Sequence, residues 1–72
     1  MNIRYSSHAL VRMSERGISR TEIKEAIGSG TKTDAPGGIR MAAYKTKTKT
    51  LIVKYQVINA KEILVVTTFN KE

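Results

Sequence analysis

The stretch SHALVRMSERGISRTEI, residues 7–23, predicts two consecutive helices and decides the first half of the fold. Ser6 and Ser7 can each accept a hydrogen bond from an unpaired backbone amide, so either residue can cap a first helix that continues to about Arg16. Gly17 is expected to end this helix, because glycine readily adopts the left-handed conformation found at helix C-termini. The inward face of the helix is predicted to carry three apolar residues: Ala9, Leu10 and Met13.

A second helix begins with two adjacent signals. Ser19 and Glu22 have the spacing of a capping box, in which each side chain bonds the backbone amide of the other residue. Ile18 and Ile23 have the spacing of a hydrophobic staple, which fixes the angle at which the chain enters the helix. The inward face is then expected to contain Ile23, Ala26 and Ile27, and the helix to end at Gly28 and Gly30 in the left-handed conformation.

The second half of the chain changes to the alternating pattern of β-strands. A turn around Pro36 and a short connection at residues 59–61 separate these strands and favour antiparallel hairpins. The sequence therefore predicts an α+β fold, in which an N-terminal two-helix hairpin packs on one face of a four-stranded antiparallel sheet. The four expected strands begin at Thr31 and span residues 39–45, 51–57 and 63–69.

The length and charge of the chain limit its architecture and its partners. Seventy-two residues are enough for one small domain, which we expect to cover residues 1–72. A chain this short, with no cysteine, buries only a thin core, and dimerisation or a bound RNA would add stability. The net charge of +7 makes polyanions the first partners to consider, because phosphate backbones attract cationic proteins without sequence readout.

Several classes of protein are disfavoured by the composition. Without cysteine there are no disulfides, thiolate zinc sites or cysteine nucleophiles, and a single histidine with scattered carboxylates does not make a metal site. No apolar stretch is long enough for a secretory signal or a membrane span. We therefore expect a cytoplasmic protein with no metal, cofactor or membrane partner.

One segment, KTKTKT at residues 45–50, has a biased composition. As a strand it would place its lysines on one face, where they could follow the phosphates of a nucleic acid. We favour a solvated hairpin tip or a lysine-protected edge strand, which is the more common role of such a segment. The candidate substrate-binding lysines here are Lys45, Lys47 and Lys49.

The only histidine, His8, lies on a polar stripe of the first helix with Arg12 and Arg16, at intervals of four residues. An imidazole can transfer a proton near neutral pH, and guanidinium groups bind phosphate oxygens and stabilise a phosphorane. These are the parts of a metal-independent ribonuclease. On spacing alone a structural role is the better interpretation, with His8 as an amide cap or a partly buried side chain and the arginines paired with Glu15 or solvent.

The same residues carry a resemblance. His8, Ala9, Arg12, Arg16 and the following Gly-Ile-Ser fit the pattern H-A-x-x-R-x-x-x-R-G-I-S, which resembles the signature of a small family of uncharacterised bacterial and phage domains. That family is grouped with the barnase, EndoU, colicin and RelE-like ribonuclease fold. The resemblance implies one RelE/barnase-like domain and site roles for His8, Arg12, Arg16 and a hydroxyl of the last strand, Thr67 or Thr68.

Two further residues are candidates from the strand pattern. Tyr55 could donate a proton to a phosphate or stack on a base, although its place among Leu51, Val53 and Val57 favours the core. Lys54 lies on the opposite face of the same strand and is an alternative phosphate contact.

Two functions follow. The first is a metal-independent, toxin-like endoribonuclease in which His8 transfers the proton and the arginines hold the phosphate. The alternative is a non-catalytic basic module that binds RNA or a protein, such as a host factor or a cognate antitoxin. The enzyme needs His8, whereas the binding module would depend on the lysines.

Overall fold

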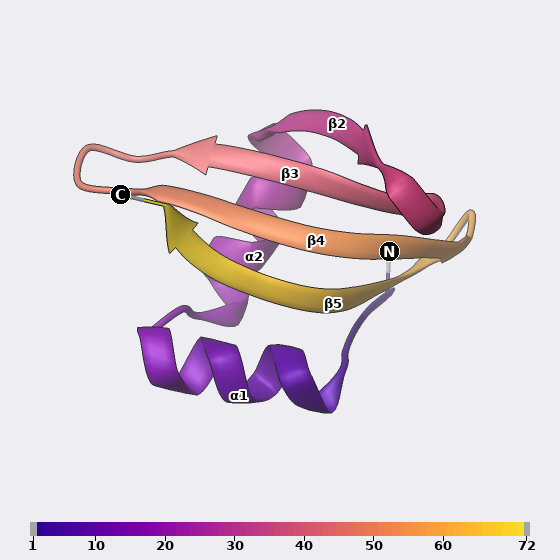
Figure 1. Cartoon of the computed structure of the whole chain (residues 1–72), viewed down its shortest axis with the longest axis horizontal. Coiled ribbons are helices and arrows are strands. Elements are labelled where there is room, and N and C mark those ends of the chain that lie inside the picture. The colour runs from indigo at the N-terminus through magenta and orange to yellow at the C-terminus, as the bar shows by residue number, and fades with distance from the viewer. Residues whose placement is uncertain (1, 72) are drawn as a thin grey trace.

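The computed structural model describes residues 2–71 and places two helices on one face of a sheet (Figure 1). Neither helix is long and apolar enough to cross a membrane. A short 3₁₀ turn at Pro36–Gly38 joins two of the strands. The elements are β1 (Asn2–Tyr5), α1 (Ser7–Arg16), α2 (Arg20–Ser29), β2 (Thr31–Ala35), β3 (Ile39–Lys45), β4 (Thr50–Asn59) and β5 (Glu62–Lys71).

The sheet has five strands in the order β1-β5-β4-β3-β2. β2 to β5 form the predicted antiparallel hairpins, but β1 adds a parallel edge strand beside β5, with Ile3 opposite Ile63. The prediction of four antiparallel strands is therefore wrong by one strand. β1 could not be predicted because it has only four residues and pairs with residues about 60 positions away. A parallel pair with such a distant partner has no local turn that would reveal it in the sequence.

The predicted ends of α1 are largely confirmed. Ser6, not Ser7, is the N-cap, and Gly17 ends the helix with a φ of 65°. Ala9 and Met13 are buried, but the prediction that Leu10 faces inward is wrong, because its side chain is 43% exposed. α1 packs along the margin of the sheet beside β5, so only a narrow stripe of the helix is covered.

α2 begins with the predicted capping box between Ser19 and Glu22, but its end differs from the prediction. Gly30 has a φ of −72°, so the expected left-handed glycine cap is wrong. A Cβ at this position would lie 2.5 Å from the Ala26 carbonyl oxygen and 2.8 Å from that of Ala43. Glycine is needed here because the chain at Gly30 lies close both to the last turn of α2 and to β3.

A β-bulge in β5 changes which side chains face the helices. Tyr55 pairs with Val65 and Lys54 with Thr67, so Val66 has no partner on β4. Side chains alternate across a strand, and one extra residue exchanges the two faces from that point onward. Thr68 therefore joins Val65 on the helix-covered face, whereas an uninterrupted alternation would have placed Thr67 there instead.

Gly30, the cap residue after α2, and Gly28, within the helix, provide a test of this close approach. We expect Gly30→Ala to lower the free energy of unfolding by about 1–3 kcal/mol, because backbone atoms must move to admit the methyl group. Gly28→Ala is the matched control, since a Cβ there meets nothing within 4 Å. It should raise the stability by up to about 1 kcal/mol through helix propensity. Urea unfolding of the three proteins measures both changes, and equal effects would contradict the packing described here.

Glu22 makes the stability depend on pH. The backbone N–H of Ser19 and the Lys49 ammonium, 3.1 Å from the carboxylate, lower the pKa of Glu22 below its ordinary value of 4.5. A lowered pKa in the folded state means that the carboxylate stabilises the fold above that value and loses this effect as the pH falls through the folded pKa. The advantage of wild type over Glu22→Gln in urea unfolding should therefore be largest near neutral pH and shrink in acid. A difference that stays constant with pH would contradict this.

Candidate functional site

One hydroxyl group fixes α1 against β5. Ser6 Oγ accepts a hydrogen bond from the Ala9 amide at 3.0 Å and donates one to the Val66 carbonyl oxygen at 2.8 Å. The Ser6 amide also donates to the Val65 carbonyl oxygen at 3.0 Å. The start of α1 is thus tied to the bulge of β5, which places the first turn of the helix beside Thr67.

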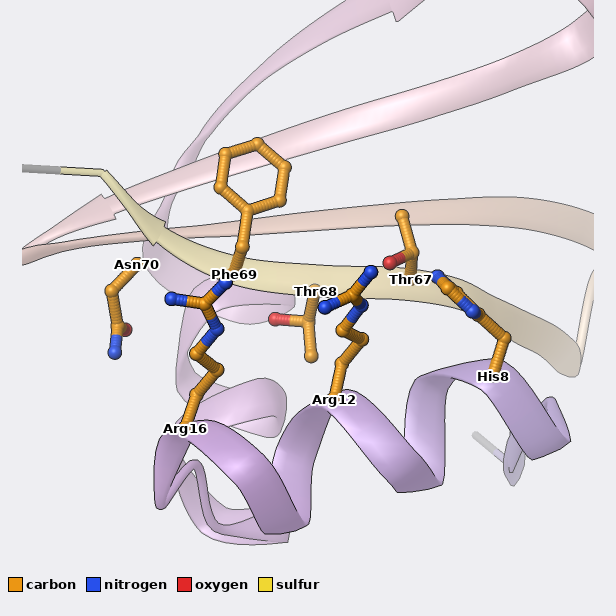
Figure 2. Close-up of a pocket in the computed structure, with 7 residues that line it drawn as sticks. All are labelled: His8, Arg12, Arg16, Thr67, Thr68, Phe69 and Asn70. Carbon is orange, nitrogen blue, oxygen red and sulfur yellow. The ribbon is translucent and has the colours of Figure 1, made fainter.

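The polar stripe of α1 and the C-terminal half of β5 enclose a pocket of about 280 Å³. His8, Arg12 and Arg16 extend from successive turns of the helix toward the strand (Figure 2). The structure therefore brings together all three predicted residues of this stripe. The wall on β5 is formed by Thr67, Thr68, Phe69 and Asn70.

The side chains of the stripe are available to a ligand. His8 is exposed and does not cap the helix, since Ser6 does so. Arg12 forms one ion pair with Glu15 at 3.4 Å, but their side chains are 40% and 55% exposed. An ion pair so exposed contributes little and is easily exchanged for another anion. The pocket thus offers one imidazole and two guanidinium groups to a phosphate.

The two threonines of β5 have different roles because of the bulge. Thr68 is fully buried, and its hydroxyl donates to the Ile52 carbonyl oxygen at 2.8 Å. Thr67 is half-buried on the other face, and its side chain lies at the His8 end of the pocket (Figure 2). The Thr67 hydroxyl is therefore the one that can contact a substrate, whereas the Thr68 hydroxyl is already hydrogen-bonded within the sheet.

Two residues of the pocket, Phe69 and Asn70, were not predicted from the sequence. The Asn70 side chain points into the pocket, and its Oδ1 atom is buried with no hydrogen-bond partner among residues 2–71. A buried acceptor of this kind ordinarily has a partner. Their closeness to Thr67 in the sequence was the available signal, but the faces could not be assigned without the bulge.

Tyr55 lies outside the pocket. Its side chain is 3% exposed in the core beneath the helices, beside a separate cavity that Ile27 and Arg40 also line. Tyr55 thus has the core position that the strand pattern favoured, and the structure does not bring it to His8.

The predicted lysines are also dispersed. Residues 46–49 form the tip of the β3–β4 hairpin, in agreement with the hairpin tip predicted for this segment. The Thr46 hydroxyl donates to the Lys49 carbonyl oxygen there at 2.9 Å. Lys45 and Lys47 line a shallow cavity at this tip, and the Lys49 ammonium is held by Glu22. Lys54 lies on the helix-free face of the sheet.

The chemistry of the pocket is that of anion binding and proton transfer. Within residues 2–71, no three histidine or carboxylate side chains gather into a group that could hold a metal ion. Guanidinium groups bind phosphate oxygens through paired hydrogen bonds, and an exposed imidazole can accept or donate a proton.

Residues 5–70 match the model of one protein family, described as the domain of unknown function DUF4258. The chain belongs to this family. No curated protein matches the sequence. Among solved structures, the chain is similar to BrnT, a ribonuclease toxin of Brucella abortus, with a TM-score of 0.78 and 12% identity. The match covers 100% of this chain and 97% of BrnT, so the two share one α+β fold over their whole lengths.

The two hydrogen bonds of the Ser6 hydroxyl, called here the Ser6 tether, can be tested by comparing a substitution of Ser6 with one of Ser7. We expect Ser6→Ala to lower the free energy of unfolding by about 1–2 kcal/mol, because the helix loses its cap and the Val66 carbonyl loses a donor. Ser7→Ala is the matched control, since Ser7 is exposed in the first turn of α1. It should change the stability by less than about 0.5 kcal/mol. Urea unfolding distinguishes the two, and equal midpoints would contradict the tether.

Proposed function

We propose that this member of the DUF4258 family is a toxin-like endoribonuclease that cleaves RNA without a metal ion. The observation that carries the proposal is the pocket that His8, Arg12 and Arg16 line together with Thr67, whose side chain lies at the His8 end. The fold shared with a ribonuclease toxin supports it. The net charge of +7 favours a polyanionic substrate.

The proposed reaction uses the 2′-hydroxyl of RNA as the nucleophile. His8 accepts the proton of this hydroxyl while its oxygen attacks the adjacent phosphorus. Arg12 and Arg16 neutralise the charge that grows on the phosphorane oxygens, and Thr67 donates a hydrogen bond to one of them. The bond to the 5′-oxygen breaks, and that oxygen takes a proton from the imidazolium or from water. The products are a 2′,3′-cyclic phosphate and a free 5′-hydroxyl.

The remaining basic residues have a supporting role in this proposal. Lys45 and Lys47, at the hairpin tip, attract the RNA backbone through long-range electrostatics. Tyr55 takes no part, because it is buried in the core. RNA as the substrate implies action in the cytoplasm. A cognate antitoxin with acidic groups would complement the cationic pocket and block it.

One observation favours a second candidate, a non-catalytic module that binds RNA or a protein. The pocket contains a single imidazole, whereas RNA cleavage moves two protons. In such a module the arginines would hold the phosphate, and no bond would break.

Cleavage of labelled total RNA in excess EDTA, with and without ribosomes, separates the two functions. We expect wild type to leave cyclic phosphate ends and His8→Ala to be slower by about 100- to 10,000-fold, as for the loss of a general base. Arg12→Ala and Arg16→Ala should also reduce the rate. Arg40→Ala is the charge-matched control, because Arg40 pairs with Asp34 away from the pocket. It should cleave at nearly the wild-type rate.

Circular dichroism and urea unfolding establish that each variant is folded. Cleavage that persists in folded His8→Ala would reject the assigned base. RNA that is bound but left intact by wild type would favour the binding module.

A further inference from the structure

The helix-free face of the sheet carries an aromatic ring next to the pocket. Phe69 follows the bulge of β5, so its side chain points away from α1 (Figure 2). The register places Ile52 opposite it on β4, and Ile52 is only 5% exposed although no helix covers this face. The Phe69 ring therefore lies beside a well-packed apolar neighbour and remains partly exposed.

Cationic side chains surround this ring. The Lys54 ammonium lies 5.9 Å from the centroid of the Phe69 ring. Lys71 is two residues further along β5 on the same face, and the register places Lys45 in the same row as Lys71. Among the described strand residues of this face, Glu62 is the only carboxylate, and it is paired with Arg4 at 2.7 Å. The charge around Phe69 is thus suited to phosphates.

The ring and the pocket are continuous around one edge of the sheet. β1 pairs with β5 only as far as Val65, so β5 has no strand partner on this side beyond the bulge within the described chain. The pocket is lined by Thr68 and Asn70 from one face of β5 and by Thr67 and Phe69 from the other. A nucleotide chain can therefore pass from the arginines around this open edge to the ring.

We propose that Phe69, flanked by Lys54 and Lys71, is a stacking platform for a base of single-stranded RNA next to the phosphate held by Arg12 and Arg16. This inference rests on the proposed function and adds its substrate class. An exposed aromatic ring stacks on an unpaired base of any identity, whereas a base within a duplex is already stacked and paired. The platform thus selects unpaired RNA and does not select a sequence.

Binding measurements test the platform without cleavage. The affinity of a fluorescein-labelled single-stranded oligoribonucleotide is measured by fluorescence anisotropy, with all proteins in the His8→Ala background so that the RNA stays intact. We expect Phe69→Leu to weaken binding by about 5- to 100-fold, because leucine keeps the apolar volume but cannot stack. Phe69→Tyr should keep nearly full affinity. Val57→Ala is the control, since Val57 is 47% exposed at the other end of the strands.

The salt dependence separates stacking from charge. Lys54→Ala and Lys71→Ala should each reduce the slope of log affinity against log salt by about 0.7 in magnitude, the effect of one phosphate contact on a single strand. Phe69→Leu should leave the slope unchanged. The corresponding RNA duplex should bind weakly and show no dependence on Phe69.

Each failure has a separate meaning. If Phe69→Leu binds as well as the parent protein, or if Phe69→Tyr is as weak as Phe69→Leu, the platform is rejected, while His8-dependent cleavage would still support the ribonuclease. If the RNA stacks on Phe69 but wild type does not cleave it, the platform stands and the ribonuclease is rejected. If the parent protein binds no RNA, both are rejected, and the face would be open to a protein partner.

Discussion

The Ser6 hydroxyl is the point on which the arrangement of this small domain depends. It joins the first turn of α1 to the carbonyl oxygen of Val66, a residue 60 positions away and the bulged residue of β5. One group thereby sets both where the helix starts and where it meets the sheet. Because side chains on α1 repeat every turn, fixing its start fixes the positions of His8, Arg12 and Arg16 along the strand. The tether thereby gives the two walls of the pocket a common register.

The features of the fold that could be predicted are those that depend on residues close together in the sequence. The capping box of Ser19 and Glu22 and the left-handed Gly17 involve residues within a few positions of each other, so the sequence reveals them directly. Hairpins are likewise local, and β2 to β5 form in the order that the alternating pattern predicts, although a bulge interrupts the alternation of β5. β1 depends on a distant partner and was missed. The role of Gly30 could not be predicted, because one of its two close contacts is with Ala43 on another element.

The same division applies to the site. His8, Arg12 and Arg16 share one helix, so their spacing alone places them on one stripe, and the structure directs this stripe to a pocket. The opposite wall lies beyond the bulge, which exchanges the faces of Thr67 and Thr68. No residue in this part of β5 indicates a bulge from the sequence alone. The family resemblance could therefore imply a hydroxyl of the last strand without choosing between the two threonines. Phe69 and Asn70 remained hidden for the same reason.

The packing of α1 against β5 also has a consequence for biosynthesis. It makes the pocket from an early helix and a late strand, so a ribosome completes α1 long before it reaches Thr67. During that interval the cationic stripe has no opposite wall, and the Ser6 hydroxyl has no carbonyl to bond. A nascent chain of this protein therefore lacks the assembled pocket until β5 has left the exit tunnel. Translation itself thus delays the appearance of the site in the cell that makes it.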